Sequence, residues 1–120
     1  TNRALVVAGD PADESALVST LVEAGWQVTL ADTKRSAMYE ASLSHFDLIV
    51  LDVSAPQLES LRVAKLLRQL EEYSGQRATI FAVGETERLN GLEECGFDGT
   101  IEQPVTKEKI LMHLDTRVSA

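Results

Sequence analysis

The stretch "FDLIVLD", residues 46–52, constrains the fold more than any other part of the sequence. Leu48 to Leu51 form an unbroken apolar run, which ends in the carboxylate of Asp52. A strand that is apolar on both sides suits the centre of a parallel sheet covered by helices on both faces. In such open sheets, sites lie outside the carboxyl ends of the strands. We therefore expect Asp52 to face a site.

The rest of the chain alternates short apolar runs with longer amphipathic stretches. Strands are predicted at 4–8, 26–31, 46–52, 78–84 and within 98–105, and helices at 10–25, 33–45, within 55–75, at 85–96 and at 106–119. Five strands alternating with five helices predict an α/β fold in three layers, with helices on both faces of a parallel sheet. The length of 120 residues fits a single domain, 1–120.

Local signals define the helix ends and faces. Asp10 is suited to cap the first helix, and Pro11 to occupy its first position. Gly91 weakens the predicted helix at 85–96. The side chains expected to face inward are Leu17, Leu21, Ala24, Ala37, Ala41, Leu43, Leu58, Leu61, Leu66, Leu70, Ile110, Leu114 and Val118.

Composition excludes several classes of function. The formal net charge of −8 argues against nucleic acid as a partner, because binding to phosphate backbones needs clustered Lys and Arg. The single cysteine, Cys95, excludes an internal disulfide and suits a reducing compartment. No apolar run approaches the length of a membrane span, and no signal peptide is recognisable, so we expect a cytoplasmic domain without direct membrane contact.

The motifs "ALVVAGDP", "AGWQVTLAD", "FDLIVLDVSAP" and "IEQPV" resemble a receiver domain of two-component signalling, the module that accepts phosphate on an aspartate. The resemblance covers about residues 3–118 and implies a flavodoxin-like (βα)5 three-layer sandwich with the strand order 2-1-3-4-5. Asp52 stands at the phospho-acceptor position, Pro56 follows at the family's spacing, and Pro104 matches the proline of a Lys-Pro pair. The parent protein implied is a response regulator or a hybrid histidine kinase, of which this would be a cytoplasmic part.

Other positions of the family's site depart from its pattern. Ala8 and Gly9 replace two acids, Gly84 replaces a Ser or Thr, Gln103 replaces the Lys, and Thr100 replaces the switch aromatic. Acyl phosphate formation needs Mg²⁺ to neutralise the phosphoryl group, and Gln103 carries no charge to assist. Because such groups act as a unit, their joint loss predicts a near-complete loss of phosphorylation. Asp10 either caps its helix or, with Asp52, supports a metal.

Two hypotheses follow. In the first, the chain is a degenerate pseudo-receiver without cofactor, in which Asp52 is vestigial and forms a partly exposed carboxylate bonded to backbone N–H groups or water. It would regulate a histidine kinase or a neighbouring receiver domain by docking or through a small effector. In the second, a histidine kinase phosphorylates Asp52 with an atypical Mg²⁺ site. The surface expected to dock comprises Glu87, Arg88, Asn90, Glu102, Lys107, Lys109 and Met112.

Overall fold

A computed structural model describes residues 2–117 and contains one five-stranded sheet. Its strands are β1 (Arg3–Val7), β2 (Gln27–Ala31), β3 (Leu48–Asp52), β4 (Thr79–Gly84) and β5 (Gly99–Glu102). All pairings are parallel, and the strand order is β2-β1-β3-β4-β5, as expected. Every residue of β3 is buried, as its unbroken apolar run predicted.

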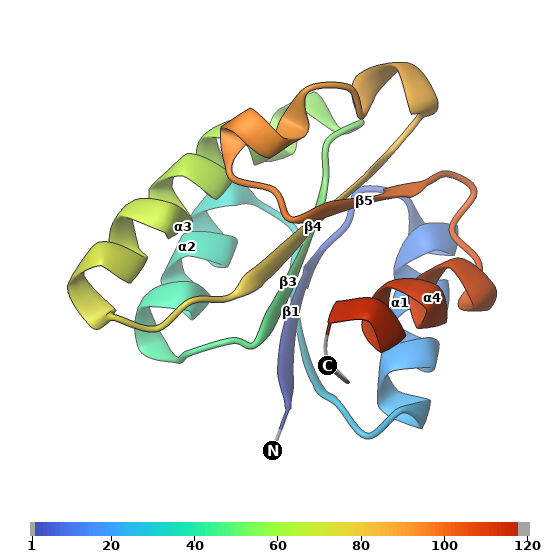
Figure 1. Cartoon of the computed structure of the whole chain (residues 1–120), viewed down its shortest axis with the longest axis horizontal. Helices are drawn as coiled ribbons and strands as arrows, with labels where there is room; N and C mark the ends of the chain where they lie inside the picture. Colours follow the sequence, from blue (N-terminus) through green and yellow to red (C-terminus); the bar gives the residue numbers. More distant parts are fainter. Residues whose placement is uncertain (1, 118–120) are drawn as a thin grey trace.

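Helices cover both faces of the sheet (Figure 1). They are α1 (Pro11–Glu23), α2 (Lys34–Leu43), α3 (Ser60–Ser74) and α4 (Lys107–Arg117). Alternate residues of the strands point to opposite faces. Val6 therefore packs in the core under α1 and α4, and Leu5 packs in the core under α2 and α3. No helix among residues 2–117 is long and apolar enough to cross a membrane.

The predicted helix at 85–96 is absent. The segment instead forms two short 3₁₀ turns, η2 (Thr86–Arg88) and η3 (Leu92–Cys95), so the described residues contain four α-helices and not five. Gly91 and Gly96 flank η3 with positive φ angles of 74° and 101°, which an α-helix does not accommodate. A third 3₁₀ turn, η1 (Pro56–Leu58), precedes α3.

Some inward-facing residues were predicted correctly and others were not. Leu17, Leu21, Ala37, Leu58, Ile110 and Leu114 are buried, and Ala41 and Leu66 are half-buried. The predictions for Ala24, Leu43, Leu61 and Leu70 were wrong, because these residues are exposed. Helix α3 begins only at Ser60, after the left-handed residue Glu59, and it buries Val63, Ala64 and Leu67 instead. Val118 lies outside the described residues.

Candidate functional site

Asp52 ends β3 and is buried, with 2% of its surface exposed. Its carboxylate accepts two backbone hydrogen bonds, from Gly9 N to Oδ2 at 3.1 Å and from Ser54 N to Oδ1 at 2.8 Å. Ser60 Oγ donates to the Asp52 carbonyl at 2.6 Å. The expectation of backbone N–H partners is confirmed, but the expectation of partial exposure was wrong, because only 2% of the residue is exposed.

The residues after β1 offer this carboxylate no acidic neighbour. Ala8 and Gly9 carry no acid, and Gly9 contributes its backbone N–H. Asp10 caps α1, as predicted, because its Oδ1 accepts from Ala12 N at 2.7 Å and Asp13 N at 3.4 Å. Its carboxylate is therefore used at the helix end.

Gly84 ends β4 in a place with no room for a side chain. A Cβ atom there would lie 2.9 Å from Val53 Cγ2 and 3.1 Å from Ser54 Oγ. The first distance is shorter than real Cβ contacts show, so a residue with a hydroxyl would require Val53 to move. Thr100 lies one strand away, opposite Ala82 and outside the group around Asp52.

Gln103 follows β5 and connects three segments. Its Nε2 donates to Asp13 Oδ2 at 2.6 Å, and its Oε1 accepts from Ser54 Oγ at 3.2 Å. Its backbone N donates to the Gly84 carbonyl at 2.9 Å. The amide of Gln103 thus bonds to Asp13 and makes no bond to Asp52. Pro104, the next residue, is exposed.

Asp13 is a residue of this site that the sequence reasoning missed. It lies in the first turn of α1, is only 5% exposed, and also accepts from Val105 N at 3.2 Å. Its place after Asp-Pro reads as an ordinary acid in a first helical turn, where acids are favourable. Its partners Gln103 and Val105 are distant in sequence, so no local pattern could have identified it.

Neutral groups alone hold the two buried carboxylates. Asp52 and Asp13 make no ion pair with a Lys or Arg among residues 2–117. The nearby Lys109 donates to the carbonyls of Glu102 and Pro104, and Lys107 pairs with Glu23 at 2.9 Å, which raises the Lys107 pKa. In the described part of the chain, no buried side-chain nitrogen or oxygen is without a hydrogen bond.

This donor set does not fit a magnesium ion of the family's kind. Mg²⁺ is usually held by one or two carboxylates and several waters in strict octahedral geometry. Asp52 has no second carboxylate beside it from the residues after β1, because Ala8 and Gly9 carry none and the Oδ1 of Asp10 is used as the helix cap. No group of three His, Cys, Asp or Glu side chains suited to a metal occurs within residues 2–117.

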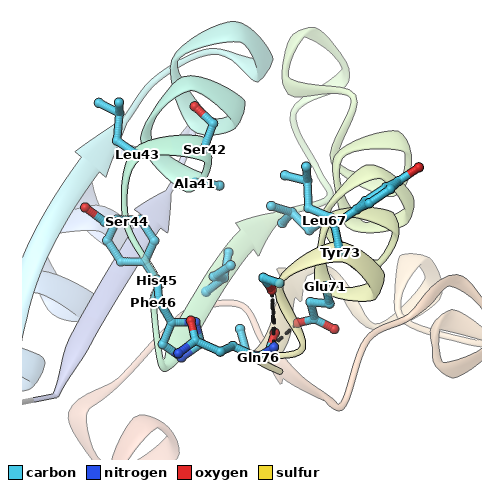
Figure 2. A pocket seen from close by; sticks show the side chains of 14 residues that line it. Ala41, Ser42, Leu43, Ser44, His45, Phe46, Leu67, Glu71, Tyr73 and Gln76 are labelled. Carbon is cyan, nitrogen blue, oxygen red and sulfur yellow. Dashed lines mark hydrogen bonds between the residues drawn. The ribbon is translucent and has the colours of Figure 1, made fainter.

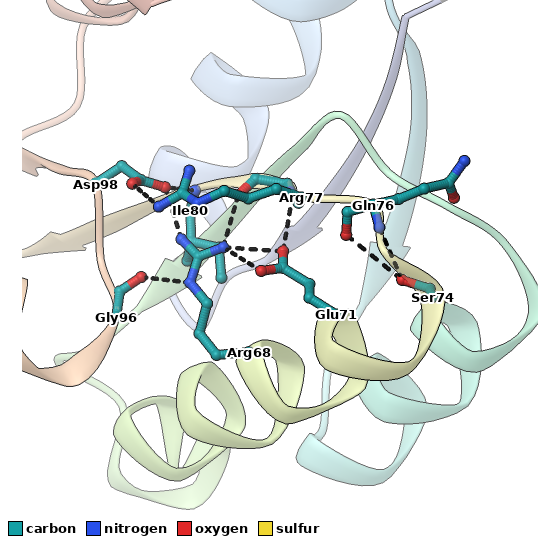
Figure 3. A network of polar contacts seen from close by, with 9 residues as sticks. Arg68, Glu71, Ser74, Gln76, Arg77, Ile80, Gly96 and Asp98 are labelled. Carbon is teal, nitrogen blue, oxygen red and sulfur yellow. Dashed lines mark hydrogen bonds and ion pairs between the residues drawn. The ribbon is translucent and has the colours of Figure 1, made fainter.

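A charged network lies at the opposite edge of the sheet (Figure 3). Arg68 donates to Asp98 Oδ2 at 2.7 Å, to Glu71 Oε1 at 2.8 Å, and to the carbonyls of Gly96 and Ala78. Arg77 donates to Asp98 Oδ1 at 2.5 Å. Burial favours the neutral acid, but hydrogen bonds from Arg77, Ile80 N and Arg68, with the charge of Arg68, outweigh it and hold the Asp98 pKa below its ordinary value. This network fastens the segment that leads into β5.

Comparison with known proteins identifies the class of domain. No protein-family model matches the sequence. The chain is 26% identical over 112 residues to the signal transduction histidine-protein kinase BarA of Escherichia coli K12, covering 88% of this chain and 12% of that protein. It is 30% identical over 112 residues to the response regulator MprA of Mycolicibacterium vanbaalenii, covering 93% and 48% respectively. The chain thus spans less than half the length of each of these relatives.

The structural likeness extends over the whole fold. The chemotaxis response regulator CheY4 of Vibrio cholerae superposes with a TM-score of 0.84 at 25% identity, over 97% of this chain and 98% of that one. The sheet order, the position of Asp52 and these similarities together define the class: the chain is a CheY-like receiver domain of two-component signalling.

Proposed function

We propose that this receiver domain is a pseudo-receiver, a non-catalytic module that regulates a two-component phosphorelay protein by binding another protein. One observation carries the proposal. The acceptor-position carboxylate of Asp52 is buried among neutral donors, and the amide of Gln103, at the position of the family's lysine, is bonded to Asp13. None of these groups carries a positive charge, such as the family's lysine would supply, to offset the charge on a transferred phosphoryl group.

The proposed partner is a histidine kinase or a neighbouring receiver domain, in the same protein or in another. Two comparisons support this. BarA, a relative, is itself a histidine kinase. The receiver domain of the yeast response regulator Ssk1, solved in complex with the histidine phosphotransfer protein Ypd1, shares the fold with a TM-score of 0.84 at 19% identity. The parent would be a hybrid kinase with this domain in the cytoplasm, and a small effector is the alternative means of control.

The second candidate function is a working phospho-acceptor. The observation that favours it is the retention of Asp52 at the carboxyl edge of β3, with Pro56 at the family's spacing. Under this alternative a histidine kinase phosphorylates Asp52, and Asp10 supports an atypical Mg²⁺ site after giving up its helix cap.

An amide NMR titration separates the two candidates. The folded domain is titrated with Mg²⁺ and then with Mg²⁺ plus beryllium fluoride, a phosphoryl mimic. The proposal predicts no saturable shifts at Gly9, Asp52 or Gly84, and none at Asp10. Saturable shifts there that an Asp52→Asn variant abolishes would establish the acceptor instead. In the parent protein, Asp52→Asn is expected to leave signalling unchanged.

A further inference from the structure

A groove opens between the C-terminal ends of α2 and α3, at the edge of the sheet opposite Asp52 (Figure 2). Its volume is about 440 Å³, within the range of binding pockets. Buried apolar side chains line its inner part, among them Phe46, Ile49 and Leu67. Phe46 precedes β3 and Ala78, another lining residue, precedes β4, so the groove lies where these strands begin.

Large apolar side chains project around the mouth of this groove instead of covering it. Leu43 at the end of α2 is 62% exposed, Tyr73 near the end of α3 is 90% exposed, and Leu70 is 37% exposed. Figure 2 shows Leu43 and Tyr73 on opposite walls. A hollow surrounded by exposed apolar side chains is typical of a surface that binds another protein. Leu43 and Leu70 are two of the residues that were predicted to face inward and that the fold leaves exposed.

The ends of the two helices that form the groove are negatively charged. A helix C-terminus bears a partial negative charge, and neither α2 nor α3 has a basic residue in its last turn. Those turns instead contain Glu40, Glu71 and Glu72. Arg68 neutralises Glu71, but no ion pair joins Glu40 or Glu72 to a basic side chain in the described part of the chain.

The residues that line the groove include no Lys or Arg among those described, and His45 lies 3.6 Å from the Asp47 carboxylate. The nearby Arg77 is paired with Asp98. A cation does border the groove at Phe46, where the Arg3 guanidinium lies 5.7 Å from the centre of the ring. The last turns of α2 and α3 hold no basic residue, so an anionic ligand at those helix ends would find no cation on either helix end.

We propose that the groove between α2 and α3 binds a basic amphipathic helix of a partner protein, with apolar side chains in the hollow and Lys or Arg beside the two helix ends. Helices that dock in this way insert side chains spaced three or four residues apart into a hydrophobic groove. The inference rests on the proposed function in one respect, that the domain acts by binding protein. It places the contact on the side away from Asp52, where binding is independent of phosphate.

The first test uses the whole chain and a labelled synthetic peptide of Leu and Lys at amphipathic helical spacing. We expect saturable amide shifts around His45, Leu70 and Gln76, and an affinity that falls as salt rises. The variant Leu43→Ser/Tyr73→Ser should weaken binding by about tenfold or more, because it removes apolar contacts worth over 1.4 kcal/mol. The matched control, Val22→Ser/Met112→Ser, alters exposed apolar residues elsewhere and should bind like the wild type.

A second pair of variants tests the charge. Glu40→Gln/Glu72→Gln should weaken binding and flatten its salt dependence, while Glu87→Gln/Glu94→Gln, on the exposed η2–η3 segment, should change neither. Amide spectra confirm that each variant is folded.

Shifts outside the groove, equal binding of a Leu/Glu peptide, or insensitivity to Leu43→Ser/Tyr73→Ser would overturn the proposal. So would a dimer in sedimentation that Leu43→Ser/Tyr73→Ser dissolves, since the occupant would then be a second copy. These measurements use no Mg²⁺ and no phosphoryl mimic. Their failure would therefore overturn only the proposal about the groove, and the beryllium fluoride titration would still decide the pseudo-receiver proposal.

Discussion

The parallel strands all begin at one edge of the sheet, the amino edge, and all end at the other, the carboxyl edge. Carboxylates at these two edges are held by different kinds of group. At the amino edge, Asp98 is held by the guanidinium groups of Arg68 and Arg77. At the carboxyl edge, Asp52 and Asp13 are held by backbone N–H groups and by the amide of Gln103. Both arrangements satisfy their oxygens, but only the first supplies a positive charge.

The difference shows which edge depends on charge. Buried ion pairs are costly to break, because the partner left behind is an uncompensated charge. The amino edge relies on such pairs to fasten the η3–β5 segment. The carboxyl edge, where receivers of this family carry out their chemistry, satisfies its acids with neutral donors alone. The ion pairs around Asp98 therefore serve structure, and no Lys or Arg among the described side chains pairs with Asp52 or Asp13.

The largest effect is expected at the amino edge. Arg68→Ala leaves Asp98 and Glu71 without their shared cation and frees the carbonyls of Gly96 and Ala78. Asp98 keeps its bond to Arg77, but Glu71 and the two carbonyls lose their shared donor, so we expect a loss of about 3 kcal/mol in the free energy of unfolding, measured by urea denaturation. Arg62→Ala, an exposed change on the same helix, is the control and should cost under about 0.5 kcal/mol. A loss from Arg68→Ala no larger than the control's would remove the contrast between the edges.

At the carboxyl edge, Asp13→Ala should cost less. The change leaves Gln103 Nε2 and Val105 N without their acceptor, but exposes no unpaired charge. We expect a loss of about 1–3 kcal/mol in the free energy of unfolding. Ser15→Ala, an exposed position on the same helix, is the control. A double-mutant cycle with Gln103→Ala should show coupling, and additive losses would mean that the bond between the two side chains contributes nothing.

Gly84→Ala tests how tightly the carboxyl edge is packed. The added Cβ would meet Val53 Cγ2 at 2.9 Å, so we expect a loss of about 1–2 kcal/mol by chemical denaturation. Because Val53 is only half-buried, part of the strain can relax. Val53→Ala in the same chain should recover much of the loss. A Gly84→Ala variant as stable as the wild type would show that space for a side chain exists there.

The smallest expected effect is on the stability of the domain at low pH. The Asp98 pKa is lowered in the fold, so its contribution to stability is present above its ordinary pKa of about 3.9 and is lost as the pH falls toward the lower folded value. The urea midpoint of the wild type should therefore fall more steeply below about pH 4 than that of Asp98→Asn. Glu87→Gln should retain the wild-type slope. Parallel curves for all three proteins would contradict the lowered pKa.

The sequence predicted the architecture well because it depends on patterns that are local. The apolar run ending in Asp52 and the alternation of runs were sufficient to predict a parallel sheet covered by helices, whereas the strand order came from the resemblance to receiver domains. The prediction of a helix at 85–96 was wrong because Gly91 and Gly96 adopt positive φ angles. The predictions that Leu43 and Leu70 face inward were wrong because helical periodicity does not fix which stripe of a helix faces the core. At the site, the sequence was sufficient to identify the positions around Asp52 that depart from the family's pattern. It was not sufficient to identify Asp13, because the partners of Asp13 are distant in sequence.

The close packing at Gly84 has an evolutionary consequence. A threonine there meets Val53 before it can meet a phosphate, and a lysine in place of Gln103 would find Asp13 at hand, within reach of the atom that its amide now contacts. Each of these two substitutions would meet a neighbour that fits the present residue. A lineage that restored the threonine and the lysine would therefore have to change Val53 and Asp13 as well.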